Sequence, residues 1–85
     1  MTNPTEVGEF GTKFWGNPEG DLHREDGPAV EFAHSRCKEW WLNGKLHRLD
    51  GPAIEHIRGY NEWFINDEQL TEEEHAERVK EMQDD

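Results

Sequence analysis

The sequence predicts a mainly β fold (β+α), an antiparallel β-meander of about 2.5 short repeats closed by a C-terminal capping helix. The first observation is a repeat, because Leu22–Ala29 returns as Leu46–Ala53 with only Glu25 and Leu49 differing. The second is an aromatic motif that precedes each copy and occurs once more after the second copy. The third is the segment after Leu70, which loses the repeat and acquires the spacing of a helix.

The 85 residues suffice for one compact domain with a thin core. We divide it into a flexible N-terminal arm at residues 1–12, a β-repeat sheet at 13–70 and an acidic C-terminal helix at 71–85. The arm is expected to end in a short strand that docks on the sheet through Phe10. Four Trp, four Phe and one Tyr should supply most of the core, because each large ring can bury roughly 150–250 Å².

Each repeat is expected to open with a strand that reads charge, aromatic, aromatic, any residue, Asn. This motif aligns Lys13–Asn17 with Glu39–Asn43 and with Glu62–Asn66. Asn43-Gly44 lies between two apolar runs and predicts a tight hairpin, because both residue types tolerate positive φ. Neighbouring strand residues point to opposite faces, so one ring of each pair should enter the core and the other should lie outside. The sequence leaves open which ring is which.

An Asp-Gly-Pro turn follows in both complete copies. Glycine allows an unusual φ there, and proline cannot sit in a central strand. The turn should lead into strands at residues 29–33 and 53–57, which carry β-branched and aromatic residues. Successive units should then stack as an antiparallel meander, and the open edge strands make a homodimer an expectation.

The third copy changes into a helix after Leu70. Thr71 and Glu74 have the spacing of a capping box, and three consecutive glutamates fall in the first turn, where the helix dipole favours anions. The helix is expected from Glu72 to about Gln83. One face should pack over the open end of the sheet through Ala76, Val79 and Met82.

The stretch Trp-x-Asn-Gly-Lys-Leu-His-Arg-x-Asp-Gly-Pro-Ala at residues 41–53 resembles the MORN-type repeat family, whose units are short β-hairpins of about this period. Residues 13–29 are similar to a second copy with a longer first turn, and residues 63–70 to half a copy. The chain departs from the usual pattern after the His, where Arg and the Asp-Gly-Pro turn replace small residues. That variant resembles repeat proteins of bacteriophages and large DNA viruses. The resemblance implies an architecture and interaction roles, and it implies no activity.

Charge narrows the class of partner. Twenty acidic residues against nine basic ones give a net charge of −11 at pH 7. Direct binding to nucleic acid needs many cationic side chains, and so does binding to an anionic membrane. We therefore expect neither, and the charge favours a basic protein partner instead.

Cysteine content and hydropathy indicate the compartment. Cys37 is the only cysteine, so no intramolecular disulfide can form and no multi-cysteine metal site exists. This fits a reducing environment. No apolar run approaches a membrane span, and the start of the chain lacks a signal-peptide pattern. We expect a soluble cytoplasmic protein, acting in the host-cell cytoplasm if it is viral.

Four side chains of the repeat recur at equivalent positions and should neighbour one another across the sheet: His23, Arg24, His47 and Arg48. One interpretation is a shared ligand site in which the arginines hold an anion or a phosphate. The other is structural, with Arg24 pairing Asp26 and Arg48 pairing Asp50 inside each turn. The structural interpretation is favoured, because a repeated motif usually meets a need of every unit.

No catalytic or metal chemistry is indicated, so we expect no enzyme, no metal and no cofactor. A zinc site commonly uses four ligands at fixed spacing, and no such spacing occurs among His23, His34, His47, His56 and Cys37. Arg36 and Lys38 could lower the pKa of the Cys37 thiol. No nucleophile motif surrounds it, however, so a loop or surface cysteine is favoured.

The aromatic pairs and the acidic end of the chain are the favoured binding features. Exposed Trp rings are common at binding hot spots. Residues 67–85 hold nine carboxylates against Arg78 and Lys80, which indicates either a solvated helix face or a surface that imitates a phosphate backbone. The expected partner-binding residues are Trp40, Trp41, Trp63, Glu31, Glu55, Glu62, Glu72, Glu73 and Glu77.

Three functions follow as hypotheses. The leading one is a non-enzymatic, phage-encoded protein that blocks a host nucleic-acid-binding protein, such as a CRISPR complex or another defence nuclease, by occupying its basic groove. The second is a protein that sequesters a nucleotide-like signal by stacking on a Trp ring and binding Arg24 and Arg48. The third is a structural or assembly module made of repeats.

Overall fold

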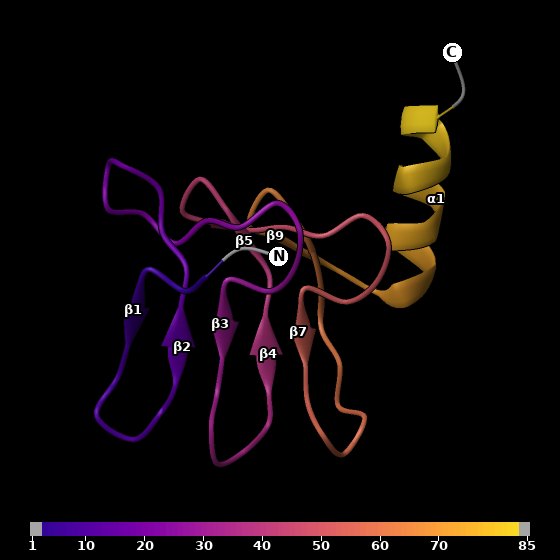
Figure 1. Cartoon of the computed structure of the whole chain (residues 1–85). Helices are drawn as coiled ribbons and strands as arrows, with labels where there is room; N and C mark the ends of the chain where they lie inside the picture. The colour runs from indigo at the N-terminus through magenta and orange to yellow at the C-terminus, as the bar shows by residue number, and fades with distance from the viewer. Residues whose placement is uncertain (1–2, 84–85) are drawn as a thin grey trace.

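The computed structural model describes residues 3–83, in which five short strands lie side by side in one antiparallel sheet (Figure 1). The strand order is β1-β2-β3-β4-β7, so the chain leaves the sheet after β4 and returns to it at β7. The fold of the described residues is therefore mainly β with a C-terminal helix, as the sequence predicts. The strands are β1 (Glu6–Val7), β2 (Lys13–Phe14), β3 (Val30–Glu31), β4 (Lys38–Glu39) and β7 (Ile54–Glu55).

A second row of hairpins continues from these strands and lies above them in Figure 1. An isolated bridge between Gly16 and Leu22 forms the first hairpin. The next pairs β5 (Trp41–Leu42) with β6 (Lys45–Leu46), and the last pairs β8 (Trp63–Ile65) with β9 (Glu68–Leu70). Backbone bonds link neighbouring hairpins, since Gly44 N–H donates to the Leu22 carbonyl and Asp67 N–H to the Leu46 carbonyl, each at 2.8 Å. The repeats therefore stack along one direction.

The predicted tight hairpin at Asn43-Gly44 is confirmed. Both residues have positive φ, 51° and 80°, which is the conformation that a two-residue turn needs to match strand twist. The last hairpin turns in the same way at Asn66 and Asp67, with φ of 49° and 70°. Asparagine and aspartate tolerate this region better than most side chains, so turn chemistry sets both hairpins locally.

Hydrogen bonding shifts the alignment of the first aromatic pair by one residue. Trp15 and Trp40 are equivalent, because their N–H groups donate to the carbonyls of Ala29 and Ala53 at 2.8 and 2.6 Å. The sequence motif aligned Trp15 with Trp41 instead. The first hairpin turn is one residue longer than the second, and this extra residue moves the ring out of the expected register.

The described core is small and follows the repeat. Ala29 and Ala53, the last residues of the two Asp-Gly-Pro-Ala turns, are fully buried. Full burial at both positions favours a small apolar side chain, and the alanine recurs there. The other buried hydrophobic residues are Trp15, Val30, Ile65 and Leu70.

Charges alternate across the five-stranded sheet. Lys13 pairs with Glu31, Glu31 with Lys38, and Lys38 with Glu55. Directly opposed residues of opposite charge stabilise an antiparallel pair. This row keeps one face of the sheet polar.

A short strand forms within the N-terminal arm, as expected. β1 pairs with β2 through Glu6 opposite Phe14 and Val7 opposite Lys13, so this part of residues 1–12 belongs to the sheet. Phe10 is 71% exposed in the turn between these strands, and its ring meets the His34 ring edge-on at a centroid distance of 6.4 Å.

Helix α1 spans Glu72–Gln83, in agreement with the predicted range. The capping box is present: Glu74 N–H donates to Thr71 Oγ1 at 3.0 Å, and Thr71 N–H donates to a Glu74 carboxylate oxygen at 2.9 Å. The helix contacts β8 and β9 and so covers the end of the row of hairpins.

The face that α1 presents to the sheet agrees only in part with the prediction, since Ala76 and Val79 line a hollow there together with Trp63 and His75. Ala76 and Met82 are exposed and Val79 is half-buried, whereas His75 is 4% exposed. His75 Nε2 lies 2.6 Å from the Arg48 carbonyl and donates to it. A polar contact with the sheet thus orients the helix, and a search for apolar residues at helical spacing does not detect such a contact.

Candidate functional site

Arg24 is held by contacts within its own repeat. Its Cζ atom lies 4.0 Å from the ring centroid of Trp15. Its Nε donates to Asp26 at 2.9 Å, and its Nη1 donates to the Pro28 carbonyl at 3.1 Å and to Glu31 at 3.4 Å. The guanidinium therefore joins the aromatic strand, the turn and the following strand.

Arg48 repeats the arrangement in the second copy. Its Cζ lies 3.7 Å from the ring centroid of Trp40. Its Nε donates to Asp50 at 2.8 Å, and its Nη1 donates to the Pro52 carbonyl at 3.2 Å and to Glu55 at 3.0 Å. The predicted pairing of each arginine with the aspartate two residues later is confirmed. The recurring residues of the motif are the parts of one structural joint.

The glycine of each Asp-Gly-Pro turn leaves room for the arginine. A Cβ atom on Gly27 would lie 2.8 Å from Arg24 Cζ, and one on Gly51 would lie 2.8 Å from Arg48 Cζ. Side-chain carbon atoms do not approach so closely. Gly27 and Gly51 do not have the unusual φ that the sequence suggested, since they are not among the described glycines with positive φ. The close approach of the guanidinium favours glycine at both positions instead.

The two histidines of the motif attach neighbouring hairpins to each other. Nδ1 of His23 accepts from Asn43 N–H at 2.9 Å, and Nδ1 of His47 accepts from Asn66 N–H at 3.1 Å. Each ring therefore carries its hydrogen on Nε2 when neutral. Burial, together with the charge of His75, lowers the pKa of His47, which favours this neutral form.

The four residues expected as a ligand site do lie together. They line a hollow of about 460 Å³ between the first two hairpins, with Trp40 on its wall. Their polar groups already make the internal contacts described above, so an incoming anion would compete with Asp26 and Asp50 for the guanidinium groups. The residues that the hollow shares with the predicted site are His23, Arg24, His47 and Arg48.

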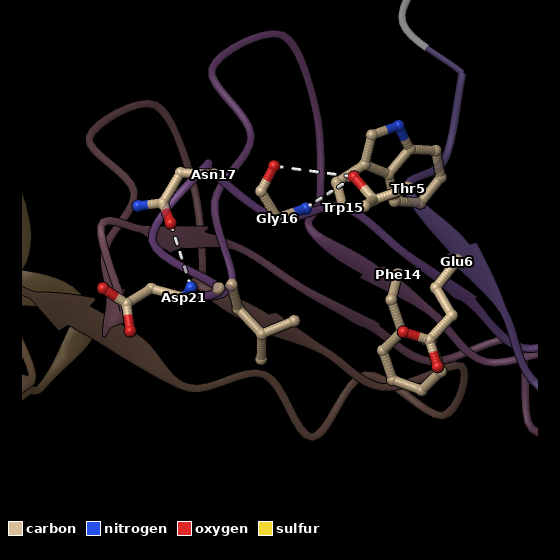
Figure 2. Close-up of a pocket in the computed structure, with 9 residues that line it drawn as sticks. Thr5, Glu6, Phe14, Trp15, Gly16, Asn17 and Asp21 are labelled. Atoms are coloured by element: carbon tan, nitrogen blue, oxygen red, sulfur yellow. Dashed lines mark hydrogen bonds between the residues drawn. The ribbon is translucent and has the colours of Figure 1, made fainter.

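A smaller hollow of about 260 Å³ lies at the first hairpin (Figure 2). Figure 2 shows Thr5 beside Gly16, whose N–H donates to Thr5 Oγ1 at 2.9 Å, and Asn17 beside Asp21, whose N–H donates to Asn17 Oδ1 at 2.9 Å. These bonds attach the segment before β1 and close the long turn. The polar atoms that line this hollow thus stabilise the fold.

The tryptophans that were expected to bind a partner are less exposed than the sequence predicts. Trp40, Trp41 and Trp63 are all half-buried. Trp40 Nε1 donates to Glu55 and Trp41 Nε1 donates to Glu39, each at 2.9 Å. The indole N–H groups of Trp40 and Trp41 thus have internal partners, and the Trp40 ring packs under Arg48, so these two rings serve the repeat joints.

The most exposed aromatic rings lie at the turns of the five-stranded sheet. Phe10 is 71% exposed and Tyr60 is 73% exposed. They lie outside the repeated aromatic motif, so the sequence pattern did not single them out. A turn residue that is large, apolar and absent from the repeat is the signal that would have identified them.

The predicted glutamates divide into two groups. Glu31 and Glu55 are paired with the repeat arginines. Glu62 lies 3.4 Å from His56 and accepts from Gln69 at 3.2 Å. These three carboxylates serve internal contacts, whereas Glu72, Glu73 and Glu77 on α1 are exposed.

The outer side of α1 carries a row of carboxylates. Glu73, Glu77 and Glu81 are four residues apart, so they lie on one side of the helix about 6 Å apart along its axis. All three are exposed and make no hydrogen bond or ion pair within residues 3–83. We call these three residues the acidic row. Glu72 instead lines a hollow on the sheet side of the helix together with His75.

Cations near α1 do not neutralise the acidic row. Arg78 forms an ion pair with Glu68 at 3.1 Å, and this hydrogen-bonded contact raises the pKa of Arg78, with Glu81 and Glu74 adding to the effect. Lys80 is exposed. Within the described chain, the helix therefore presents more negative charge than its own arginine and lysine can balance.

Comparisons of the chain with known protein families, with curated proteins and with solved structures found no match. Among residues 3–83, no three or more His, Cys, Asp and Glu side chains are grouped so that they could hold a metal ion. The helix in this part of the chain is too short and too polar to cross a membrane.

Proposed function

We propose that this chain is a non-enzymatic acidic binding protein whose helix α1 occupies the basic groove of a nucleic-acid-binding protein. The acidic row carries the proposal, because Glu73, Glu77 and Glu81 are exposed, regularly spaced and make no hydrogen bond or ion pair in the described chain. A regular line of negative charge is the feature that a phosphate backbone presents to basic proteins.

The distribution of charge supports this surface over the rest of the molecule. On the sheet, Arg24 and Arg48 each hold two carboxylates. On the helix, Arg78 is the one arginine, and it is directed to Glu68. The long-range field of a net charge of −11 should therefore be strongest at α1.

Because the tryptophans are half-buried, the proposed binding depends on charge rather than on exposed aromatic rings. Binding through a charged row should be fast and sensitive to salt, since exposed charges more than about 8–10 Å apart are screened at physiological ionic strength. The resemblance of the repeats to phage and viral repeat proteins extends the proposal to a target class. That class is a host defence nuclease, such as a CRISPR complex, whose groove normally holds nucleic acid.

Affinity capture with matched variants tests the proposal. The wild-type chain and the triple variant Glu73→Gln, Glu77→Gln, Glu81→Gln are immobilised and exposed to nuclease-treated bacterial lysate at low and high salt. The expected result is a nucleic-acid-binding protein that the wild type retains at low salt, that the variant loses and that duplex DNA displaces.

A control variant distinguishes the effect of the acidic row from the effect of net charge. The triple variant Glu6→Gln, Glu9→Gln, Glu19→Gln removes the same charge from exposed sites away from α1. This variant should still capture the nucleic-acid-binding protein. If wild type and helix variant capture the same proteins, or if DNA does not compete, the proposed function is wrong.

A second function, sequestration of a nucleotide-like ligand, is favoured by one observation. His23, Arg24, His47 and Arg48 line one hollow of about 460 Å³. A ligand bound there would raise the melting temperature. A thermal-shift screen with nucleotides distinguishes this function, because binding through α1 predicts no shift with any of them.

A further inference from the structure

Cys37, His56 and Glu62 form a chain of polar contacts at the turn edge of the five-stranded sheet. Cys37 Sγ lies 3.7 Å from Nδ1 of His56, and Nε2 of the same ring lies 3.4 Å from a Glu62 carboxylate oxygen. Activated nucleophiles are built in this order, with a base beside the nucleophile and a third group orienting the base. We call these three residues the thiol relay.

The register of the sheet assembles the thiol relay. In the β4–β7 pair, Lys38 lies opposite Glu55, so the next two residues along the strands, Cys37 and His56, also face each other. Glu62 lies opposite Ile54 on the other side of β7, diagonal to His56. Directly opposed and diagonal side chains of a sheet are within contact distance.

The surroundings of the relay favour a thiolate beside an imidazolium. Hydrogen bonds from Ser35 and from the backbone of Ile57, together with the His56 ring, lower the pKa of Cys37. Hydrogen bonds to Cys37 and then to Glu62 raise the pKa of His56. Both directions increase the fraction of reactive thiolate near neutral pH, since the thiolate is the nucleophilic form of cysteine.

A hollow of about 370 Å³ adjoins the sulfur. Ile57 and Tyr60 line it and are 62% and 73% exposed, so they offer an apolar surface. Arg58 also lines it and makes no ion pair within residues 3–83. The hollow therefore suits a small molecule that is partly apolar and negatively charged.

Besides the relay, the ionisable side chains that line the hollow with the sulfur are His34, Arg58 and Tyr60. Glu62 is the carboxylate of the relay, and its second contact is with the neutral Gln69. Arg36 and Lys38, the sequence neighbours of Cys37, do not line the hollow. Arg58 is therefore the permanent cation that attracts an anion into it.

We propose that Cys37 is a modification site at which a small anionic disulfide forms a mixed disulfide with the protein. The Cys37 thiolate attacks one sulfur of the disulfide, whose S–S bond breaks while a new S–S bond to Cys37 forms. The second sulfur leaves as a thiolate and is thereby reduced, and the Cys37 sulfur is oxidised. The proton that Cys37 gave up remains on His56 or passes to the leaving thiolate.

The rate of reaction with dithiobis(nitrobenzoate), an anionic aromatic disulfide, tests the proposal. The absorbance of the released thiolate is followed from pH 5 to pH 9, and mass spectrometry confirms one adduct on the single cysteine. The wild-type rate should have its midpoint below the ordinary thiol value of about 8.5. His56→Gln should raise the midpoint and slow the reaction at pH 6.

Two further variants identify the contributions of the relay and the hollow. Glu62→Gln should fall between wild type and His56→Gln, and His34→Gln, in the same hollow but outside the relay, should match wild type. Arg58→Gln should reduce the preference for the anionic disulfide over the cationic disulfide cystamine. Circular dichroism establishes that each variant is folded.

The wild-type profile by itself can overturn the proposal. A midpoint at the ordinary thiol value would mean that the relay does not activate Cys37, whatever the variants do. Equal wild-type rates with the anionic and the cationic disulfide would overturn the proposed substrate class. Equal rates for folded His56→Gln and wild type would remove His56 from the site.

Discussion

Arg48 lies over the indole ring of Trp40, with its Cζ atom 3.7 Å from the ring centroid, and both side chains bind the same carboxylate. Glu55 accepts from Arg48 Nη1 at 3.0 Å and from Trp40 Nε1 at 2.9 Å. The cation, the ring and the anion each contact the other two. The cation–ring contact recurs between Arg24 and Trp15, so each complete repeat is held by the same joint.

Replacing the guanidinium should weaken this joint even when the charge is kept. Arg48→Lys loses the forked contacts with Asp50 and Glu55 and should reduce the free energy of unfolding by about 2 kcal/mol. Urea denaturation followed by Trp fluorescence measures the change. Arg58→Lys, at an exposed turn, is the control and should stay within about 0.5 kcal/mol. Equal effects at both sites would contradict the assigned role of Arg48.

Filling the space beside the guanidinium should also destabilise the chain. Gly51→Ala places a Cβ atom 2.8 Å from Arg48 Cζ, and relieving this overlap should lower the free energy of unfolding by about 1–3 kcal/mol. Chemical denaturation measures it. Gly8→Ala meets its nearest neighbours at 3.5 Å and serves as the matched control. A Gly51→Ala variant as stable as the control would show that the arginine can move aside without loss.

The polar contact of helix α1 gives a third prediction. His75→Leu introduces an apolar side chain of similar size and leaves the Arg48 carbonyl without its hydrogen-bond donor. We expect a loss of about 1–3 kcal/mol and a lower melting temperature of the helical signal in circular dichroism. His34→Leu, at an exposed turn, is the control. A more stable His75→Leu variant would mean that apolar packing, rather than the hydrogen bond, holds the helix.

Asp50 should contribute to the acid sensitivity of the fold. Its hydrogen bond from Arg48 lowers the pKa of Asp50 in the folded state. A lowered folded pKa adds stability that is present above the unfolded value of about 3.9 and is lost as the pH falls through the folded value. The difference in melting temperature between wild type and Asp50→Asn should therefore shrink below about pH 4. A difference that is constant from pH 7 to pH 3 would contradict this linkage.

The features that the sequence predicted correctly depend on local chemistry. The hairpin at Asn43-Gly44 needs residues that accept positive φ, and the start of α1 needs the Thr71–Glu74 capping box. Both requirements are met within a few consecutive residues. The pairing of each arginine with the aspartate two residues later is equally local. Such features can be recognised in a short window of sequence without knowledge of the fold.

The site residues depended on longer-range geometry and were predicted less well. Trp40 and Trp63 were expected to be exposed anchors, yet stacking of neighbouring repeats leaves them half-buried. The exposed rings are Phe10 and Tyr60, in turns that carry no repeat signal. The acidic character of α1 was evident from composition, but which glutamates face outward followed from the docking of His75.

The sequence by itself determined the repeat unit, its tight turns, the extent of α1 and the excess of negative charge. The tertiary structure decided which aromatic ring of each complete repeat lies under an arginine, how α1 is rotated, and that Cys37 meets His56 and Glu62. The reason is that turns and caps depend on the conformations of adjacent residues, whereas side-chain contacts across strands depend on register. The first hairpin is one residue longer than the second, so the sequence motif aligned Trp15 with Trp41, whereas in the structure Trp15 and Trp40 make the equivalent contact with their arginines.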